Sequence, residues 1–304
     1  LPMQEDFHAS KARVRLVKGS NRSGKTLSAC IEVARAVTNA DPHGKYPKKG
    51  TWFLVGDDWS HHGKTIYPKL FVRGAFHVIR DLQTGELRAY RPWDPSDVVR
   101  VKERKEAEPM IPKRLIQSIS WHKKNEGIPK LITLKTGWTM HFFSGTSDPP
   151  QGAAIDGVLL DEEIPNEKWF PEMNSRIVDR DGKLIWSATP EVGTDAFFEL
   201  CSVAEEQELL PKNFRKIEMF QLTLKDNPHI SQQAKEAMSS MLSDEMRMVK
   251  VDGQFALSGR KVYQEFSKLV HGIERFDVPA EWTNFLAVDP GVQICAVLFG
   301  SCPC

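Results

Sequence analysis

The sequence of 304 residues has no run of about 18 apolar residues, so no transmembrane helix is expected. Its first six residues, LPMQED, lack the basic and then apolar pattern of a secretory signal peptide. The five cysteines are scattered without a repeated metal-binding spacing, and the pair Cys302 and Cys304 is more typical of a fraying end than of a metal site. These absences predict a protein of a reducing, intracellular compartment without a membrane span or a disulfide framework.

An excess of charge of one sign is also lacking, because 41 Lys and Arg residues balance 40 Asp and Glu residues for a net charge of +1. The net charge therefore favours no particular partner. Residues 100–130 are an exception, with nine Lys and Arg residues against four Glu. Such a segment is either a track for phosphate groups or a solvated loop of mixed charge, and the sequence alone favours the solvated loop.

Internal repeats and low-complexity tracts are absent, and apolar runs instead alternate with helical patterns. This alternation predicts an α/β domain with a mostly parallel sheet over residues 1–252. Charge and proline make 81–112 an expected surface insertion, 253–283 an expected linker, and 284–304 the expected start of a second domain. The expected strands are 13–18, 51–56, 158–161, 184–188, 285–288 and 294–299 and a hairpin over 131–136 and 138–144; the expected helices are 25–38, 65–72 and 231–250.

A phosphate-binding loop is the strongest motif. Residues Gly19, Ser20, Asn21, Arg22, Ser23, Gly24, Lys25 and Thr26 match G-x-x-x-x-G-K-[ST] at every fixed position. The glycines allow backbone N–H groups to face phosphate oxygens, and the following helix presents its positive N-terminal end. Lys25 is then expected to contact the β- and γ-phosphates of ATP, and the Thr26 hydroxyl to bind Mg²⁺. A chance match in a chain of this length has a probability of about one in a hundred, so a simple glycine turn is the weaker alternative.

A second motif supplies the acids that an ATPase needs. The apolar run 157–160 ends in Asp161, Glu162 and Glu163, at the edge of an α/β sheet where ligands bind. Asp161 is expected to hold Mg²⁺ through water, Glu162 to act as the catalytic base, and Glu163 to have no catalytic role. An apolar run that ends in acids is by itself a common turn, and the phosphate-binding loop is what favours the catalytic interpretation.

A third motif, I-W-S-A-T-P, ends a further apolar strand. It would place the hydroxyls of Ser187 and Thr189 beside the γ-phosphate, where they could transmit hydrolysis to the rest of the protein. The alternative is an ordinary strand that ends at Pro190.

The three motifs in this order resemble helicase-type ATPases and, more closely, the large terminase subunits of tailed bacteriophages. The resemblance covers roughly residues 4–291 and includes three later segments, G-Q-F at 253–255, V-Y-Q-E-F at 262–266 and L-A-V-D-P-G at 286–291. It implies a P-loop NTPase fold of the RecA/helicase-like, ASCE type, followed by the beginning of an RNase H-like nuclease domain. It also implies a motor that uses ATP to move double-stranded DNA into a procapsid, in the cytoplasm of an infected bacterium. The implied partners are the portal protein, the small terminase subunit and further copies of the chain in a ring.

The resemblance also implies roles for single residues. Gln4 matches the upstream glutamine that contacts adenine, Arg22 matches an arginine that contacts the γ-phosphate in cis, and Arg114 is a candidate for an arginine acting in trans. Asp289 matches a metal ligand of the nuclease, which uses Mg²⁺ or Mn²⁺. Because two-metal cleavage needs several carboxylates and the residues after Phe299 contain none, the nuclease is expected to be incomplete and inactive in this chain.

Two other functions remain open. A helicase-like, nucleic-acid-stimulated ATPase shares the motifs, but a second RecA-like domain does not fit into the remaining residues. A non-motor ATP switch would have less use for a catalytic base such as Glu162.

Overall fold

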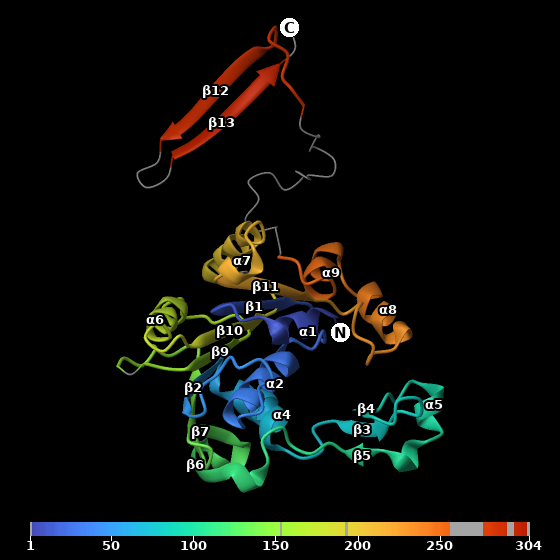
Figure 1. Ribbon diagram of the computed structural model, residues 1–304. Helices are drawn as coiled ribbons and strands as arrows, with labels where there is room; N and C mark the ends of the chain where they lie inside the picture. The colour runs from blue at the N-terminus through green and yellow to red at the C-terminus, as the bar shows by residue number, and fades with distance from the viewer. Residues whose placement is uncertain (1, 153, 192–193, 256–275, 291–294, 303–304) are drawn as a thin grey trace. The chain divides into compact units, whose positions relative to one another are not determined.

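The computed structural model describes residues 2–152, 154–191, 194–255, 276–290 and 295–302 (Figure 1). The chain forms two compact units, Leu1–Ala256 and Leu257–Cys304. Within the described ranges, no helix has the length and apolarity needed to cross a membrane.

The first unit is built on an eight-stranded sheet in the order β11-β1-β10-β9-β2-β8-β7-β6. Neighbouring strands from β11 to β8 pair in parallel, whereas β7 pairs antiparallel with both β8 and β6. A mixed α/β fold with a large, mostly parallel sheet is therefore confirmed. The strands are β1 (Val14–Gly19), β2 (Gly50–Gly56), β6 (Ile116–Lys123), β7 (Ile128–Leu134), β8 (Trp138–Ser144), β9 (Gly157–Asp161), β10 (Lys183–Ala188) and β11 (Ile217–Leu222).

Helices lie on both faces of this sheet and create two apolar cores. Along β2, Trp52 and Leu54 pack with residues of α2 and α4, whereas Phe53 and Val55 share the other core with residues of α6 and α7. Burial on both faces explains why the central strands are almost continuously apolar. The helices of this unit are α1 (Pro2–Ala9), α2 (Lys25–Val37), α3 (Trp59–His61), α4 (Tyr67–Phe71), α5 (Pro95–Val98), α6 (Trp169–Arg176), α7 (Asp195–Gln207), α8 (Gln232–Ser240) and α9 (Asp244–Lys250), with a π-helix η1 (His62–Ile66) and 3₁₀ turns η2 (Val101–Glu103), η3 (Lys113–Leu115), η4 (Lys124–Glu126) and η5 (Lys212–Phe214).

The structure differs from the sequence-based expectation in four elements. Strands β6 and β11 were not predicted, and β6 extends the expected hairpin to three strands. The expected single helix over 231–250 is two helices, because the Ser243 side chain accepts a hydrogen bond from the Met246 N–H and caps α9 as a new helix. The expected helix over 65–72 is η1 followed by α4.

The segment 81–112, predicted as an insertion, contributes β4 (Leu87–Ala89) and β5 (Lys105–Glu106) to a small sheet in the order β4-β3-β5, and the central strand β3 (His77–Arg80) directly precedes the predicted bounds. Its centre is the buried Asp97, which accepts two hydrogen bonds of 2.7 Å from the Arg88 guanidinium. Such a fork-to-fork pair fixes both side chains. The insertion also contacts the chain before α8, where Trp93 Nε1 donates to the backbone oxygen of His229 at 3.1 Å.

A buried ionic cluster ties α1, β1 and α2 together on one side of the sheet. Glu32 is fully buried, and its carboxylate lies 2.6 Å from both Arg15 Nη1 and Lys45 Nζ. It also lies 2.8 Å from His8 Nδ1 and from the Tyr46 hydroxyl. Burial alone would raise the pKa of Glu32, but the hydrogen bond from His8 and the charges of Arg15 and Lys45 outweigh it and hold this pKa below its usual range.

The second unit contains a two-stranded antiparallel hairpin, β12 (Thr283–Pro290) with β13 (Cys295–Cys302). Asp289 lies near the end of β12, opposite Ala296. Residues 256–275, which include the V-Y-Q-E-F segment, lie outside the described residues. The RNase H-like assignment and the domain boundaries therefore stay predictions.

Candidate nucleotide and magnesium site

The predicted phosphate-binding loop connects the end of β1 to the start of α2. Gly24 has φ +94°, a left-handed conformation that side chains disfavour, and it directly precedes the first residue of the helix. At Gly19, a Cβ atom would lie 2.0 Å from the Leu222 backbone oxygen of β11. Both glycines are thus required by the path of the backbone, which turns sharply from the sheet into the helix.

Lys25 spans this loop. Its Nζ donates to the Ser20 backbone oxygen at 2.8 Å and to Thr189 Oγ1 at 2.7 Å, so the side chain joins the loop to the end of β10. Burial lowers the pKa of Lys25, and the nearby charges of Glu162 and Asp161 oppose that effect. A lysine held across the loop by neutral oxygens can exchange them for phosphate oxygens when a nucleotide binds.

The remaining loop residues differ in how firmly they are held. Ser23 donates to the Ser20 backbone oxygen at 2.8 Å, and the Asn21 side chain donates to Glu191 at 3.2 Å. Arg22 has φ +60°, and its backbone oxygen accepts a hydrogen bond of 2.6 Å from the Asn227 side chain. The Arg22 guanidinium is exposed and has no ion pair within the described residues, so it is free to contact an added phosphate.

The predicted magnesium ligands lie together at the start of α2. Thr26 Oγ1 donates to Asp161 Oδ1 at 3.1 Å, and Asp161 is fully buried at the end of β9. Hard oxygen donors suit Mg²⁺, which usually takes one or two protein ligands and completes its shell with phosphate and water. The described residues hold no group of three or more His, Cys, Asp or Glu side chains able to bind a metal by themselves. The donor set therefore fits a magnesium ion that arrives with ATP.

His61 is part of this site and was missed by the sequence analysis. Its Nε2 lies 2.7 Å from Asp161 Oδ2, the oxygen that Thr26 does not contact. The neighbouring strand β2 brings it there, since Gly56 pairs with Asp161 and a Cβ on Gly56 would lie 2.9 Å from the His61 ring. Burial alone would lower the pKa of His61, but the hydrogen bond and charge of Asp161 raise it.

Glu162 follows Asp161 in a strained backbone conformation. Its φ of +73° is uncommon for a residue with a side chain, and such strain costs about 1–3 kcal/mol. Two hydrogen bonds hold it, because the Glu162 N–H donates to the Ser187 oxygen at 2.7 Å and Trp186 Nε1 donates to the Glu162 oxygen at 3.0 Å. Burial and the Asp161 charge raise the pKa of the Glu162 carboxyl, which brings its basicity closer to that of an efficient general base.

The two candidate coupling residues on the third motif are placed differently. Thr189 contacts the loop directly, since its hydroxyl accepts from Lys25 and donates to Asn21 Oδ1 at 3.1 Å. The Ser187 hydroxyl is buried without a partner in the described chain, and only the Ser187 backbone oxygen contacts Glu162. Of the other predicted residues, Gln4 lies against the start of α2, where its Nε2 donates to Ser28 Oγ at 2.9 Å.

The arrangement of strands around the site is that of the expected NTPase type, because β10 lies between the loop strand β1 and the acidic strand β9. The family model for the N-terminal part of large terminase subunits of the T4likevirus type matches residues 16–268. The chain belongs to the large terminase family.

Solved terminase structures share its fold. The large terminase of the thermophilic bacteriophage D6E in complex with ADP has a TM-score of 0.53 and 15% identity, over 99% of this chain and 64% of that chain. The ATPase domain of the Thermus phage P74-26 large terminase has a TM-score of 0.51 and 15% identity, over 83% of this chain and 92% of that domain. The HK97 bacteriophage large terminase has a TM-score of 0.50 and 11% identity, over 98% of this chain and 62% of that chain. This terminase chain thus spans less than two thirds of the D6E and HK97 chains, and no curated protein matches its sequence.

One more contact of the terminase loop comes from the end of α9. The Asn21 N–H donates to the Lys250 backbone oxygen at 3.1 Å. Gly253, at φ +66°, lies so close that a Cβ there would be 2.6 Å from Gly19 Cα. The predicted phosphate-binding loop is therefore in contact with the end of α9 and the residues that follow it in the first unit.

Proposed function

We propose that this chain is the ATP-hydrolysing part of a motor that moves double-stranded viral DNA into a procapsid. The observation that carries the proposal is the convergence of Lys25, Thr26, Asp161 and Glu162 at one edge of the sheet, within a fold that large terminases share. The D6E terminase binds ADP and ATP-γ-S, which supports ATP as the nucleotide.

The chain's own residues account for the chemistry of hydrolysis. The loop amides and Lys25 bind and orient the phosphates, Arg22 adds positive charge beside the γ-phosphate, and Gln4 contacts adenine. Thr26, and Asp161 through water, would hold Mg²⁺, which would supply positive charge to neutralise the charge that develops on the phosphates. The Glu162 carboxylate accepts the proton of the attacking water, and Thr189, which contacts both Lys25 and Asn21, transmits the change at the loop to β10.

Assembly into a ring, in which an arginine of a neighbouring copy helps to stabilise the transferring phosphoryl group, is proposed from the resemblance to large terminases. Several arginines near Arg114 in the chain are engaged within their own chain: Arg73 and Arg100 in ion pairs, Arg80 in a hydrogen bond and Arg104 against the Tyr90 ring. Arg114 is exposed and makes no ion pair in the described chain, which favours it. The portal protein and the small terminase subunit are the proposed assembly partners, and Asp289 is proposed as a metal ligand of the nuclease.

ATP turnover measured with different nucleic acids tests the proposal. Double-stranded DNA together with procapsids that carry an empty portal is expected to raise turnover, whereas procapsids alone are not. Stimulation by single-stranded nucleic acid without procapsids would instead favour the helicase-like alternative.

The hydrogen bond from His61 to Asp161 leads to a further prediction. Ligating carboxylates are oriented by hydrogen bonds, and loss of such a partner typically costs 10–100-fold in metal affinity. The His61→Ala variant is therefore expected to bind Mn²⁺ about 10–100-fold more weakly in its ADP complex, measured by electron paramagnetic resonance. The control is His77→Ala in the small three-stranded sheet, which should match the parent protein. Unchanged Mn²⁺ affinity in His61→Ala would show that Asp161 does not depend on this contact.

A further inference from the structure

Positive charge is concentrated in one part of the first unit. Residues 113–147 contain six Lys and Arg residues and a single Asp or Glu residue, Glu126, although the whole chain carries a net charge of only +1. The other basic residues of 100–130 lie in the insertion beside three glutamates. The structure thus divides the basic segment into a mixed-charge insertion and a strongly basic part that forms β6, β7 and β8.

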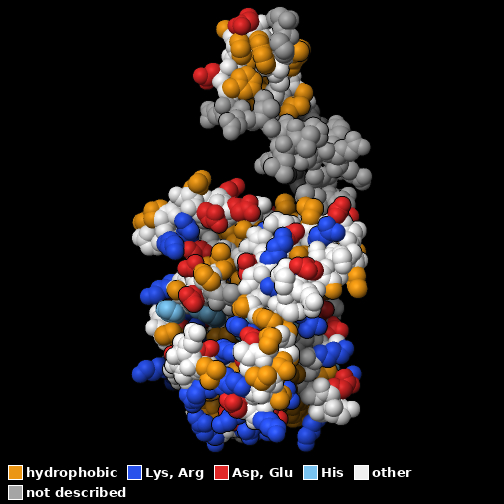
Figure 2. All heavy atoms as spheres, turned by 90° about the vertical axis from the view of Figure 1, so that its right-hand side faces the viewer, with side chains coloured by type: hydrophobic (Ala, Val, Ile, Leu, Met, Phe, Trp, Pro, Cys, Tyr) orange, Lys and Arg blue, Asp and Glu red, His pale blue; other side chains and the backbone are white. Residues whose placement is uncertain are grey.

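The basic side chains of this second part are exposed and mostly without partners. Lys123 pairs with Glu126 at 3.2 Å, whereas the other five make no ion pair with any described residue. Figure 2 views the first unit from the side of β3, β4 and β5, and Lys and Arg side chains gather at the lower end of this view. The five are Lys113, Arg114, Lys124, Lys130 and Lys135.

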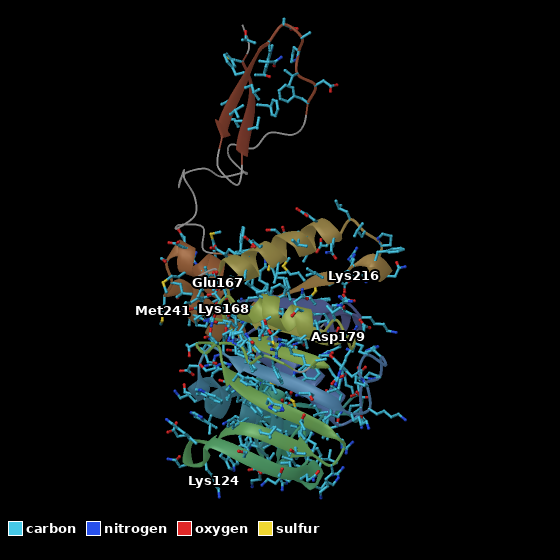
Figure 3. The ribbon with its side chains drawn as sticks, turned by 90° about the vertical axis from the view of Figure 1, so that its left-hand side faces the viewer. Lys124, Glu167, Lys168, Asp179, Lys216 and Met241 are labelled. Carbon is cyan, nitrogen blue, oxygen red and sulfur yellow. The ribbon has the colours of Figure 1, made fainter. Side chains whose placement is uncertain are left out.

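Neutral hydrogen-bonding groups lie between these cations. Gln117, Ser118 and Ser120 are exposed on β6, which is the edge strand of the sheet. In Figure 3, β6, β7 and β8 present a face without a covering helix, with Lys124 at its lower end. A hollow of about 350 Å³ on this face is lined by Trp59, Ser120, Lys130, Leu131, His141, Phe142 and Phe143. Lysines together with hydroxyl and amide groups are the donors that contact nucleic-acid phosphates.

A short segment connects this surface to the magnesium site. Trp59 of α3 stacks on His122 of β6, with ring centroids 4.1 Å apart and an interplanar angle of 6°. His61 of the same helix contacts Asp161. One turn later, a Cβ on Gly63 would lie 2.6 Å from the Glu126 backbone oxygen, so η1 packs directly on η4. A π-helix is rare and occurs frequently at functional sites, and here it lies between β6 and the ATP site.

We propose that the outer surface of β6, β7 and their turns is where this chain binds the phosphate backbone of duplex DNA. This assignment rests on the proposed function, and it adds the location of the DNA contact and its connection to Asp161 through α3 and η1. The phosphate backbone carries no sequence information, so contacts of this kind suit a motor that must move along any sequence.

Edge-strand protection is the other explanation for lysines in such a position, since charged side chains on an edge strand discourage pairing with another sheet. It accounts for Lys123 at the end of β6 but not for Lys130 on the inner strand β7 or Lys135 in the turn before β8. Register shifts along β6 already disrupt its edge. The phosphate-binding role accounts for all of these residues together.

The salt dependence of duplex binding tests whether the surface of β6, β7 and their turns contacts DNA phosphates. The Lys124→Gln/Lys130→Gln variant of the full 304-residue chain is compared with the parent on a fluorescent duplex of mixed sequence between 50 and 200 mM salt. Removing two phosphate contacts should reduce the slope of log K against log salt by about two and weaken binding roughly tenfold at the higher salt. The matched control is Lys212→Gln/Lys216→Gln. These two exposed lysines precede β11, which is at the other end of the strand order from β6.

The outcomes separate this inference from the proposed function. Equal affinities and slopes for the parent, the surface variant and the control would overturn the surface assignment while leaving duplex binding intact. Absence of duplex binding by the parent, with or without ADP, would count against both. An equal loss in the surface variant and the control would show that the binding depends on general charge, and the surface would again be rejected. Thermal unfolding midpoints of both variants within the range of the parent confirm that folding is retained.

Discussion

The Glu162→Gln variant is expected to bind Mg-ATP and to hydrolyse it at least about 100-fold more slowly than the parent chain. General-base catalysis contributes roughly 10²–10⁴-fold, and an amide cannot accept the proton of the attacking water. The left-handed backbone of Glu162 and its two hydrogen bonds involve main-chain atoms and the Trp186 ring, so the substitution leaves them in place. Single-turnover hydrolysis and fluorescent-nucleotide binding, measured on the same preparation, separate the two effects.

Glu163→Gln is the matched control, because the two glutamates are adjacent and the change is chemically identical. The Glu163 carboxylate accepts a hydrogen bond of 3.1 Å from the Thr194 N–H, away from Lys25 and Asp161. Hydrolysis by Glu163→Gln is expected to stay close to that of the parent. A large loss in Glu163→Gln with near-normal turnover in Glu162→Gln would assign the base to Glu163.

The Glu32→Gln variant is expected to lose about 3–5 kcal/mol of unfolding free energy at neutral pH, the usual cost of leaving a buried ionic partner unpaired. Arg15 and Lys45 would remain buried beside a neutral amide, with both of their side chains fully enclosed. Urea denaturation followed by tryptophan fluorescence measures the change. Glu5→Gln on the exposed side of α1 is the control, and it should lie within about 0.5 kcal/mol of the parent.

The pH dependence of this difference has a definite sign. The pKa of Glu32 is depressed in the folded state, so its stabilisation is fully present above the unfolded-state value of about 4.3. It is lost as the pH falls below that value toward the folded-state pKa. The difference in unfolding free energy between the parent and Glu32→Gln should therefore be constant from pH 7 to about pH 5 and should become smaller below about pH 4. A gap that widens on acidification would mean that Glu32 is not ionised in the folded protein.

The sequence was informative wherever the chemistry is encoded in adjacent residues. The loop from Gly19 to Thr26 and the acids after β9 were predicted because each motif is short and its residue types are set by phosphate and magnesium binding. The mostly parallel sheet followed from the alternation of apolar runs with helical patterns along the chain.

His61 could not be predicted, because it approaches Asp161 only through the parallel pairing of β2 with β9, about 100 residues apart in the chain. Strand β11 was missed for a related reason. Its sequence, I-E-M-F-Q-L, alternates only weakly, and its burial comes from contacts with α1 and α7 that no local pattern shows. The break between α8 and α9 had a local signal in Ser243, a good N-cap residue that the Met-rich helical pattern obscured.

The position of Gly253 has a mechanical consequence. The chain that leaves α9 toward the second unit passes with its backbone against Gly19 and Ser20, at a distance that leaves no room for a methyl group. Phe255, two residues later, is anchored by ring contacts with Phe197 and Phe198. Tension applied to the chain after Phe255 would therefore act first on these ring contacts and then on the backbone of the predicted phosphate-binding loop.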